Sequence, residues 1–194
     1  MASDVKKLTP ALGLAAVMWF LVMYSIAMSL DTVYEFGENY LSDLGVREGA
    51  WAFNSGVIGA GILFILFDVL AVAPMLGKDR INVFGVSFLV VAAAFLICVG
   101  IFTEDAGDIH GVVSYGFFLT MLAALGTLTW SLMKSKALGR SGAYTTLVAF
   151  VFGLVLLPMG GDPLPETLAV LGIVGWGAIM SMLLMLKGSG RRVP

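Results

Sequence analysis

The sequence Leu63-Phe64-Ile65-Leu66-Phe67 lies at the centre of an apolar run between residues 51 and 75. A transmembrane β-strand alternates apolar and polar residues over about ten positions, and this run shows no such alternation. A helix needs about 20 mostly apolar residues to cross the roughly 30 Å hydrocarbon layer of a membrane. The run is long enough for one such helix, and it predicts an all-α membrane protein.

Five further apolar runs accompany this one along the chain. The predicted spans are residues 10–30, 51–75, 81–102, 109–133, 143–160 and 167–186. Of the 194 residues, 59% are hydrophobic, and the spans use most of the chain. We therefore expect a single six-helix membrane domain over residues 1–194 and no soluble domain. Connections such as 77–80 are very short, which predicts three antiparallel hairpins.

The two signs of charge lie in different connections. The basic residues of the termini and the even connections are Lys6, Lys7, Lys78, Arg80, Lys134, Lys136, Arg140, Lys187, Arg191 and Arg192. The acidic residues of the odd connections are Asp31, Glu35, Glu38, Asp43, Glu48, Glu104, Asp105, Asp108, Asp162 and Glu166. Because Lys and Arg near membrane spans remain on the cytoplasmic side, we expect both termini in the cytoplasm. The acidic connections are then extracytoplasmic, and the protein is a multi-pass protein of the cell membrane.

The first acidic connection, residues 38–56, is too polar to span and too apolar to be a free loop. We expect it to fold back on the mouth of the bundle, where Asn39 and Asn54 are candidate ligand-binding residues. Arg47 is the one basic residue of the acidic connections, and two roles are open for it. It forms a salt bridge with Asp43 or Glu48, or it binds a phosphate or carboxylate through its guanidinium fork.

The second acidic connection contains four candidate metal ligands: Glu104, Asp105, Asp108 and His110. Carboxylates alone suit calcium or magnesium, and an added imidazole suits zinc, manganese or iron. A divalent metal (zinc, calcium or magnesium) would be the cofactor. The chain has one histidine, which excludes a tri-histidine metal site. The structural alternative is that Asp105 or Asp108 caps the following helix.

The same residues also suit acid–base chemistry. An imidazole that a carboxylate orients can activate a water or a serine hydroxyl. Ser42 and Ser114 are the candidate hydroxyls, and Ser114 lies one helical turn beyond His110. The candidate catalytic residues are His110, Asp43, Ser42, Glu104 and Asp105.

Two features lie within the spans. Asp68 is an acidic residue inside the second span, where it reaches interfacial water or pairs with Lys78 or Arg80. Small residues repeat in the second and sixth spans and indicate close helix packing, either within the bundle or between copies in a homo-oligomer. These are Gly56, Gly59 and Gly61, and Gly172, Gly175 and Gly177.

Several segments resemble the prokaryotic membrane family DUF998, a domain of unknown function. They are Asn39-Tyr40-Leu41-Ser42-Asp43-Leu44-Gly45, Phe53-Asn54-Ser55-Gly56, and Gly100-Ile101-Phe102-Thr103-Glu104-Asp105 followed by Ile109-His110. The chain is more remotely similar to the six-span Frag1/DRAM/Sfk1 group, through the segment 41–45 and His110. That group is linked to lipid handling, so the resemblance implies a role that involves lipids, and it implies no catalytic residues.

Three functions follow as hypotheses. The first is a protein that binds a lipid or small ligand in an acidic, His-containing pocket at the outer face, with membrane lipids and no nucleic acid as partners. The second is a membrane-embedded hydrolase or transferase, metal-dependent or not, that acts on lipid headgroups. The third is a structural protein that assembles through its glycine faces. The sequence leaves open whether the protein is an enzyme.

Overall fold

The computed structural model describes residues 8–135, 138–159 and 162–189. Five of the basic residues that predict the orientation lie outside these ranges, as does residue 160, the predicted end of the fifth span. The five are Lys6, Lys7, Lys136, Arg191 and Arg192. The chain is all-α, as predicted.

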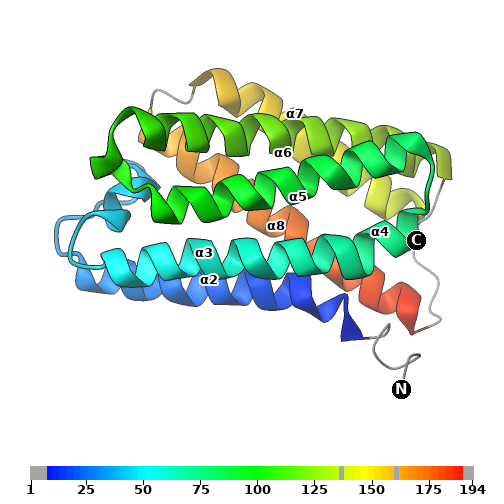
Figure 1. The fold of residues 1–194 in the computed structure, drawn as a ribbon, viewed down its shortest axis with the longest axis horizontal. Helices are drawn as coiled ribbons and strands as arrows, with labels where there is room; N and C mark the ends of the chain where they lie inside the picture. Colours follow the sequence, from blue (N-terminus) through cyan, green and yellow to red (C-terminus); the bar gives the residue numbers. More distant parts are fainter. Residues whose placement is uncertain (1–7, 136–137, 160–161, 190–194) are drawn as a thin grey trace.

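Within the described ranges, six helices are long and apolar enough to cross a membrane (Figure 1). They are α2 (Ala11–Leu30), α3 (Ala50–Phe67) with its continuation to Leu76, α5 (Arg80–Ile101), α6 (Asp108–Ser135), α7 (Gly139–Leu156) with a 3-10 turn to Met159, and α8 (Pro163–Gly188). The predicted spans are confirmed, with boundaries that differ by a few residues.

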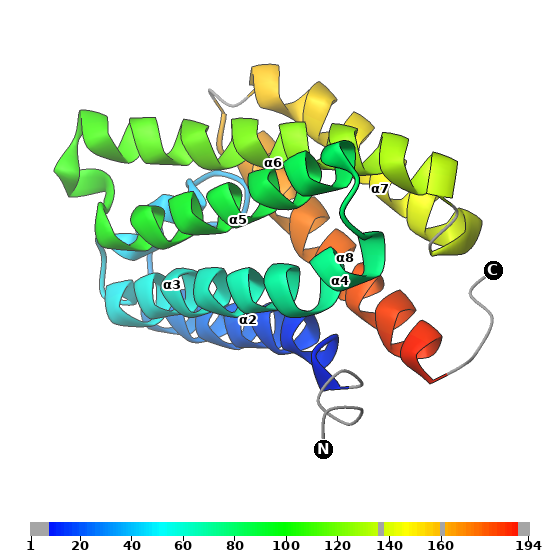
Figure 2. The same ribbon diagram turned by 45° about the vertical axis from the view of Figure 1, so that its right-hand side comes forward.

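The helices form a ring in the order of the sequence. Each long helix packs against the next, and α8 returns to pack against α2 (Figures 1 and 2). The three predicted hairpins are α2–α3, α5–α6 and α7–α8. We call the end of the bundle that contains residues 31–49, 102–107, 157–159 and 162 the acidic end. The opposite end, where α2 begins and α8 finishes, is the basic end.

The second span contains a wide turn. After Phe67 the helix becomes a π-helix over Asp68–Val72 and then continues as α4 (Ala73–Leu76). Pro74 has no backbone N–H and its ring crowds the carbonyl one turn earlier, so a regular α-helix is unfavourable at this position. The π-turn accommodates the proline without a break in the span. Such turns occur frequently at functional sites.

The first connection folds back on the bundle, as expected. A 3-10 turn, η1 (Leu41–Gly45), buries Leu41 and Leu44, which are 4% and 0% exposed. Asp31 accepts hydrogen bonds from the backbone N–H groups of Val33 and Tyr34 at 3.0 and 3.1 Å. Leu41 and Leu44 belong to one buried cluster with side chains of α2 and α3, and this packing holds η1 against the two helices. The connection is therefore an ordered cap on the acidic end.

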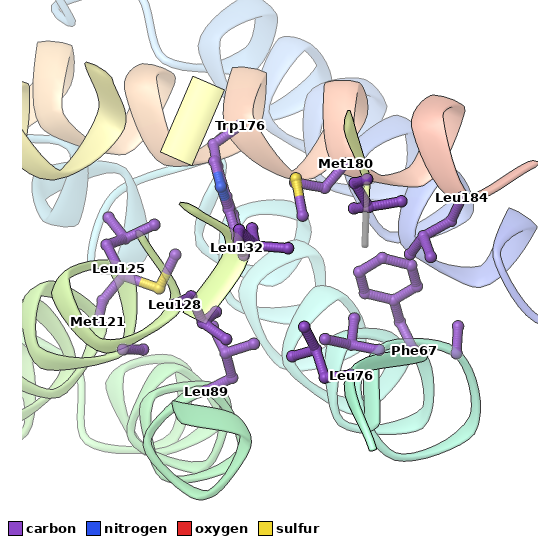
Figure 3. Close-up of a cluster of buried hydrophobic side chains, with 14 of the residues drawn as sticks. Phe67, Leu76, Leu89, Met121, Leu125, Leu128, Leu132, Trp176, Met180 and Leu184 are labelled. Carbon is purple, nitrogen blue, oxygen red and sulfur yellow. The ribbon is translucent and has the colours of Figure 1, made fainter. Parts of the chain in front are cut away.

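The main core lies in the half of the bundle toward the basic end (Figure 3). Phe67 of α3 and Leu128 and Leu132 of α6 are nearly inaccessible to solvent. Trp176 of α8 donates a hydrogen bond to the hydroxyl of Thr146 on α7 at 3.1 Å. This packing closes the ring near the basic end, and less tightly filled space remains toward the acidic end.

Candidate functional site

A pocket of about 330 Å³ opens at the acidic end, and we call it the acidic-end pocket. Its polar lining comes from four segments: the first connection, the second connection, α6 and α8. The polar side chains are Tyr40, Ser42, Glu104, His110, Ser114, Tyr115 and Glu166. Residues far apart in the sequence therefore meet at one place.

The first two connections meet through a direct hydrogen bond. The hydroxyl of Ser42 in η1 donates to Oε1 of Glu104 at 3.0 Å. Glu104 lies in η3 (Glu104–Ala106), a short 3-10 turn that contacts η1. The tight turns on both sides fix the two side chains at the mouth of the pocket.

Carboxyl groups repel one another at this mouth. Burial raises the pKa of Glu104, and a hydrogen bond and the charge of Asp43 raise it further, while Ser42 and His110 act in the opposite direction. Burial also raises the pKa of Tyr40, and nearby carboxylates add to the increase. These carboxylates belong to Glu166, Asp162, Asp43 and Glu104. The pocket therefore has a negative electrostatic potential that favours cationic and hydrogen-bond-donating groups.

His110 and Ser114 form a hydrogen-bonded pair on one face of α6. Nδ1 of His110 lies 2.7 Å from the carbonyl oxygen of Phe102, and Nε2 lies 3.3 Å from Oγ of Ser114. A carbonyl oxygen only accepts hydrogen bonds, so Nδ1 carries the proton in the neutral ring. Nε2 is then an acceptor for the Ser114 hydroxyl. The pair has the arrangement of a nucleophile and a base, with the base oriented by a third group.

A second cavity, of about 100 Å³, runs through the middle of the ring, and we call it the central cavity. Side chains of α2, α3, α5, α6 and α8 line it, and most of them are apolar. Its polar lining residues are Ser42, Ser114 and Glu166 toward the acidic end and Asp68 on the π-turn. Ser42, Ser114 and Glu166 also line the acidic-end pocket, as does Phe118. The two spaces thus share a polar rim.

The family model for DUF998, a protein of unknown function, matches residues 14–187 of the chain. The chain belongs to the DUF998 family. No curated protein and no solved structure matches it. The remoter similarity to the Frag1/DRAM/Sfk1 group stays a prediction.

Three predicted ligand-binding residues of this DUF998 protein contact other groups of the chain, and their role in ligand binding stays a prediction. Arg47 forms ion pairs with Asp43 at 3.2 Å and with Asp31 at 3.8 Å, which is the salt-bridge alternative. Asn54 donates to the carbonyl of Gly45 at 2.9 Å, and Asn39 accepts from the N–H of Glu35 at 2.8 Å. None of Asn39, Arg47 and Asn54 lines the acidic-end pocket or the central cavity. Ser114, the fourth predicted ligand-binding residue, lines both.

The predicted metal ligands are not brought together as a metal site. Within the described ranges, no group of three or more His, Cys, Asp or Glu side chains is placed to hold a metal ion. His110 directs both ring nitrogens to other partners, and Asp105 accepts a hydrogen bond from Thr103. Asp105 and Asp108 are exposed and lie outside the acidic-end pocket.

The predicted catalytic residues are also arranged differently from the expectation. The hydroxyl of Ser42 bonds Glu104, whereas the hydroxyl of Ser114 is the one that bonds the imidazole. No hydrogen bond or ion pair joins His110 to a carboxylate within the part of this DUF998 protein that the structure describes. Phe102 supplies the orienting group through its backbone, and backbone partners of this kind leave no mark in the sequence.

Glu166 is the residue that sequence reasoning missed. We expected α8 to begin at residue 167, with Glu166 in the preceding loop, but the helix begins at Pro163. Pro163 and Pro165 suit the first turn of a helix, where a missing N–H is harmless. Asp162 precedes them as the N-terminal flanking residue. The two prolines were the available signal that Glu166 lies on a helix and faces the bundle.

Proposed function

We propose that this protein binds a membrane lipid or a similar single-chain amphiphile, with the polar group in the acidic-end pocket and the chain in the central cavity. The observation that carries the proposal is the shared rim of Ser42, Ser114, Phe118 and Glu166. A polar space that continues into an apolar one matches a molecule with a polar end and an apolar end.

The length of the central cavity supports this proposal. The step from Phe53 to Asp68, which both line the cavity, covers about 22 Å of α3 at roughly 1.5 Å per residue. An extended acyl chain of a membrane lipid has a comparable length and a slender cross-section. If the acidic end is extracytoplasmic, as the charge distribution predicts, the amphiphile enters from the outer leaflet.

Binding of radiolabelled monooleoylglycerol to the delipidated protein in mild detergent tests the proposal. This probe has one chain and an uncharged headgroup. Ala92 lines the central cavity and is 1% exposed, so Ala92→Leu reduces the space for the chain. We expect it to weaken binding about tenfold, because each methylene group that loses burial costs about 0.8 kcal/mol.

Val148→Leu is the matched control, because Val148 is 67% exposed on the outside of α7. This variant should bind the probe like the wild type. Absence of saturable binding to the wild type, or equal binding by Ala92→Leu, would contradict the proposal.

The pair formed by His110 and Ser114 favours a second candidate function, a serine hydrolase or transferase that acts on the headgroup end of the amphiphile. In this role Nε2 of His110 accepts the proton of the Ser114 hydroxyl while Oγ attacks the substrate. The carbonyl of Phe102 holds the imidazole in the orientation that this step needs.

A fluorophosphonate, which modifies activated serine hydroxyls with loss of fluoride, distinguishes the two functions. An enzyme should be labelled at Ser114, and labelling should be lost in both Ser114→Ala and His110→Gln. Ser29→Ala is the control, because Ser29 is exposed on α2 and bonds only the carbonyl of Ile26 among described partners. If Ser114 is not labelled, the enzyme function is contradicted and only the binding function remains.

A further inference from the structure

Asp68 is a buried carboxyl group inside a membrane span. It is 3% exposed, lies on the π-turn of the second span and lines the central cavity. Within the described part of the chain, no hydrogen bond or ion pair satisfies its side chain. Buried polar groups are normally paired, and an ionisable group inside a membrane marks a functional site by default.

The basic residues near it in the sequence do not neutralise Asp68. Lys78 and Arg80 were its predicted partners, but both are exposed at the basic end and neither forms an ion pair with it. The residues that line the central cavity include no Lys, Arg or His. Among the described residues, none therefore offers the carboxyl group a positive charge inside this space.

The rest of the central cavity suits a cation with an apolar body. Six aromatic side chains line it: Phe20, Phe53, Phe64, Phe117, Phe118 and Trp176. The faces of aromatic rings attract cations, and this attraction strengthens when water is excluded. The acids of the acidic-end pocket would attract the same cations to the entrance.

We propose that the central cavity is a binding site for hydrophobic organic cations, in which the positive charge lies against the carboxylate of Asp68. This proposal rests on the proposed function in one respect, because both require that the central cavity admits a ligand. It goes further by assigning organic cations as a class of ligand. Such a cation and the chain of a lipid would compete for the same space.

Radiolabelled benzyltrimethylammonium is a suitable probe, because it is small and its charged group can approach a carboxylate closely. We expect saturable binding to the wild-type protein, competition by monooleoylglycerol, and weak competition by neopentylbenzene, the uncharged analogue of the same shape. Asp68→Asn should weaken binding of the cation by about tenfold or more, because the substitution removes the negative charge and keeps the size of the side chain. Binding of monooleoylglycerol should change by less than about twofold, since its chain makes no ionic contact.

Two further variants test which carboxylate of the protein contacts the bound cation. Asp79→Asn is the matched control, because Asp79 is exposed in the connection that precedes α5 and lines neither space. Glu166→Gln tests the rim, and it should weaken binding of the cation less than Asp68→Asn does. If Glu166→Gln abolishes binding and Asp68→Asn does not, the cation lies in the acidic-end pocket and the proposal is wrong.

A measurement on the wild type keeps the test valid if Asp68→Asn fails to fold. Dicyclohexylcarbodiimide is apolar and adds to carboxylic acids in apolar surroundings, so it should modify Asp68. Benzyltrimethylammonium should protect Asp68 and neopentylbenzene should not; lack of protection by the cation would overturn the proposal.

The two proposals fail separately. Binding of monooleoylglycerol without binding of benzyltrimethylammonium would overturn the cation site and leave the amphiphile function standing. The reverse result would overturn the amphiphile function and leave the cation site.

Discussion

Glu104 shows how single residues join separate parts of the acidic end. Its carboxylate accepts a hydrogen bond from Ser42, interacts with Asp43 and lines the acidic-end pocket. Each contact links η3 to η1, although the two turns are about 60 residues apart in the chain. Glu104 therefore connects the two turns at the mouth of the pocket.

Glu104→Gln should reduce the dependence of stability on pH. The pKa of Glu104 is raised in the folded protein, mainly by burial. Between the usual value, about 4.3, and the raised value, the folded state binds more protons than the unfolded state. The contribution to the free energy of unfolding is therefore largest below the usual pKa and decreases as pH rises through this window. Glutamine does not ionise, so the variant lacks this decrease.

The midpoint of thermal unfolding in detergent, followed by tryptophan fluorescence between about pH 4 and pH 8, measures this effect. The difference between Glu104→Gln and the wild type should move in favour of the variant as pH rises. Glu48→Gln removes a carboxylate from an exposed position of the first connection and is the control. A pH profile of Glu104→Gln parallel to that of the wild type would contradict the prediction.

At the scale of the helices, hydropathy predicts where each span lies in the sequence. It does not predict which face of a span points into the bundle. Every predicted span corresponds to a helix, because the length of an apolar run follows from the thickness of the membrane. Hydropathy does not distinguish a side chain that faces lipid from one that faces a cavity, since both environments are apolar. The π-turn at Asp68 and the inward position of Glu166 were therefore not predicted, although Pro74 and Pro163 lie next to them.

The glycines of α3 illustrate the same limit. They indicated close helix packing, and the structure places the contacts within the chain. Gly56 faces Met23, Gly59 faces Trp19, and Gly61 faces Ile97 and the backbone of Ala93. These side chains occupy the space beside the three glycines, and a homo-oligomer stays a prediction. Gly175 of α8 differs, because an added Cβ would have nothing within 4 Å.

Gly59→Leu should destabilise the monomer. A Cβ at this position would lie 2.2 Å from Nε1 of Trp19, whose indole donates to the carbonyl of Ser55 at 3.0 Å. Overpacking of this kind costs about 1–3 kcal/mol or more, so the unfolding midpoint should fall clearly. Gly175→Leu is the control and should leave the unfolding midpoint unchanged.

Light scattering of both variants in mild detergent gives the mass of the particle. A loss of mass in Gly175→Leu alone would identify the sixth span as the contact between copies.

At the scale of the whole molecule, the closed ring determines where a ligand can bind. Because α8 packs against α2, the central cavity is bounded by the first and last spans together. The sequence predicts three hairpins but not how they close into a ring, since the closure depends on contacts such as the close approach of Ser181 of α8 to Gly13 of α2. The grouping of Ser42, Glu104 and His110 at one end was predictable, because all three follow or precede spans on the same side.

The orientation in the membrane is a prediction from the charge distribution. Lys78 and Arg80 lie at the basic end, and Asp31, Asp43 and Glu104 lie at the acidic end. If Lys and Arg stay in the cytoplasm, the acidic-end pocket opens to the outside. Single cysteines in a Cys98→Ala background test this, because Cys98 is the one native cysteine. Glu48→Cys and Lys78→Cys place thiols at exposed positions of opposite ends.

A membrane-impermeant maleimide should label Glu48→Cys in intact cells and should label Lys78→Cys only after the membrane is opened. The reverse pattern would place the acidic end in the cytoplasm, and the amphiphile would then enter from the inner leaflet. The binding proposals would stand in that case, because they depend on the shared rim and on Asp68, which are independent of the side that each end faces. Equal labelling of both positions in sealed cells would show that the protein does not adopt a single orientation. The charge distribution would then not predict the orientation in the membrane.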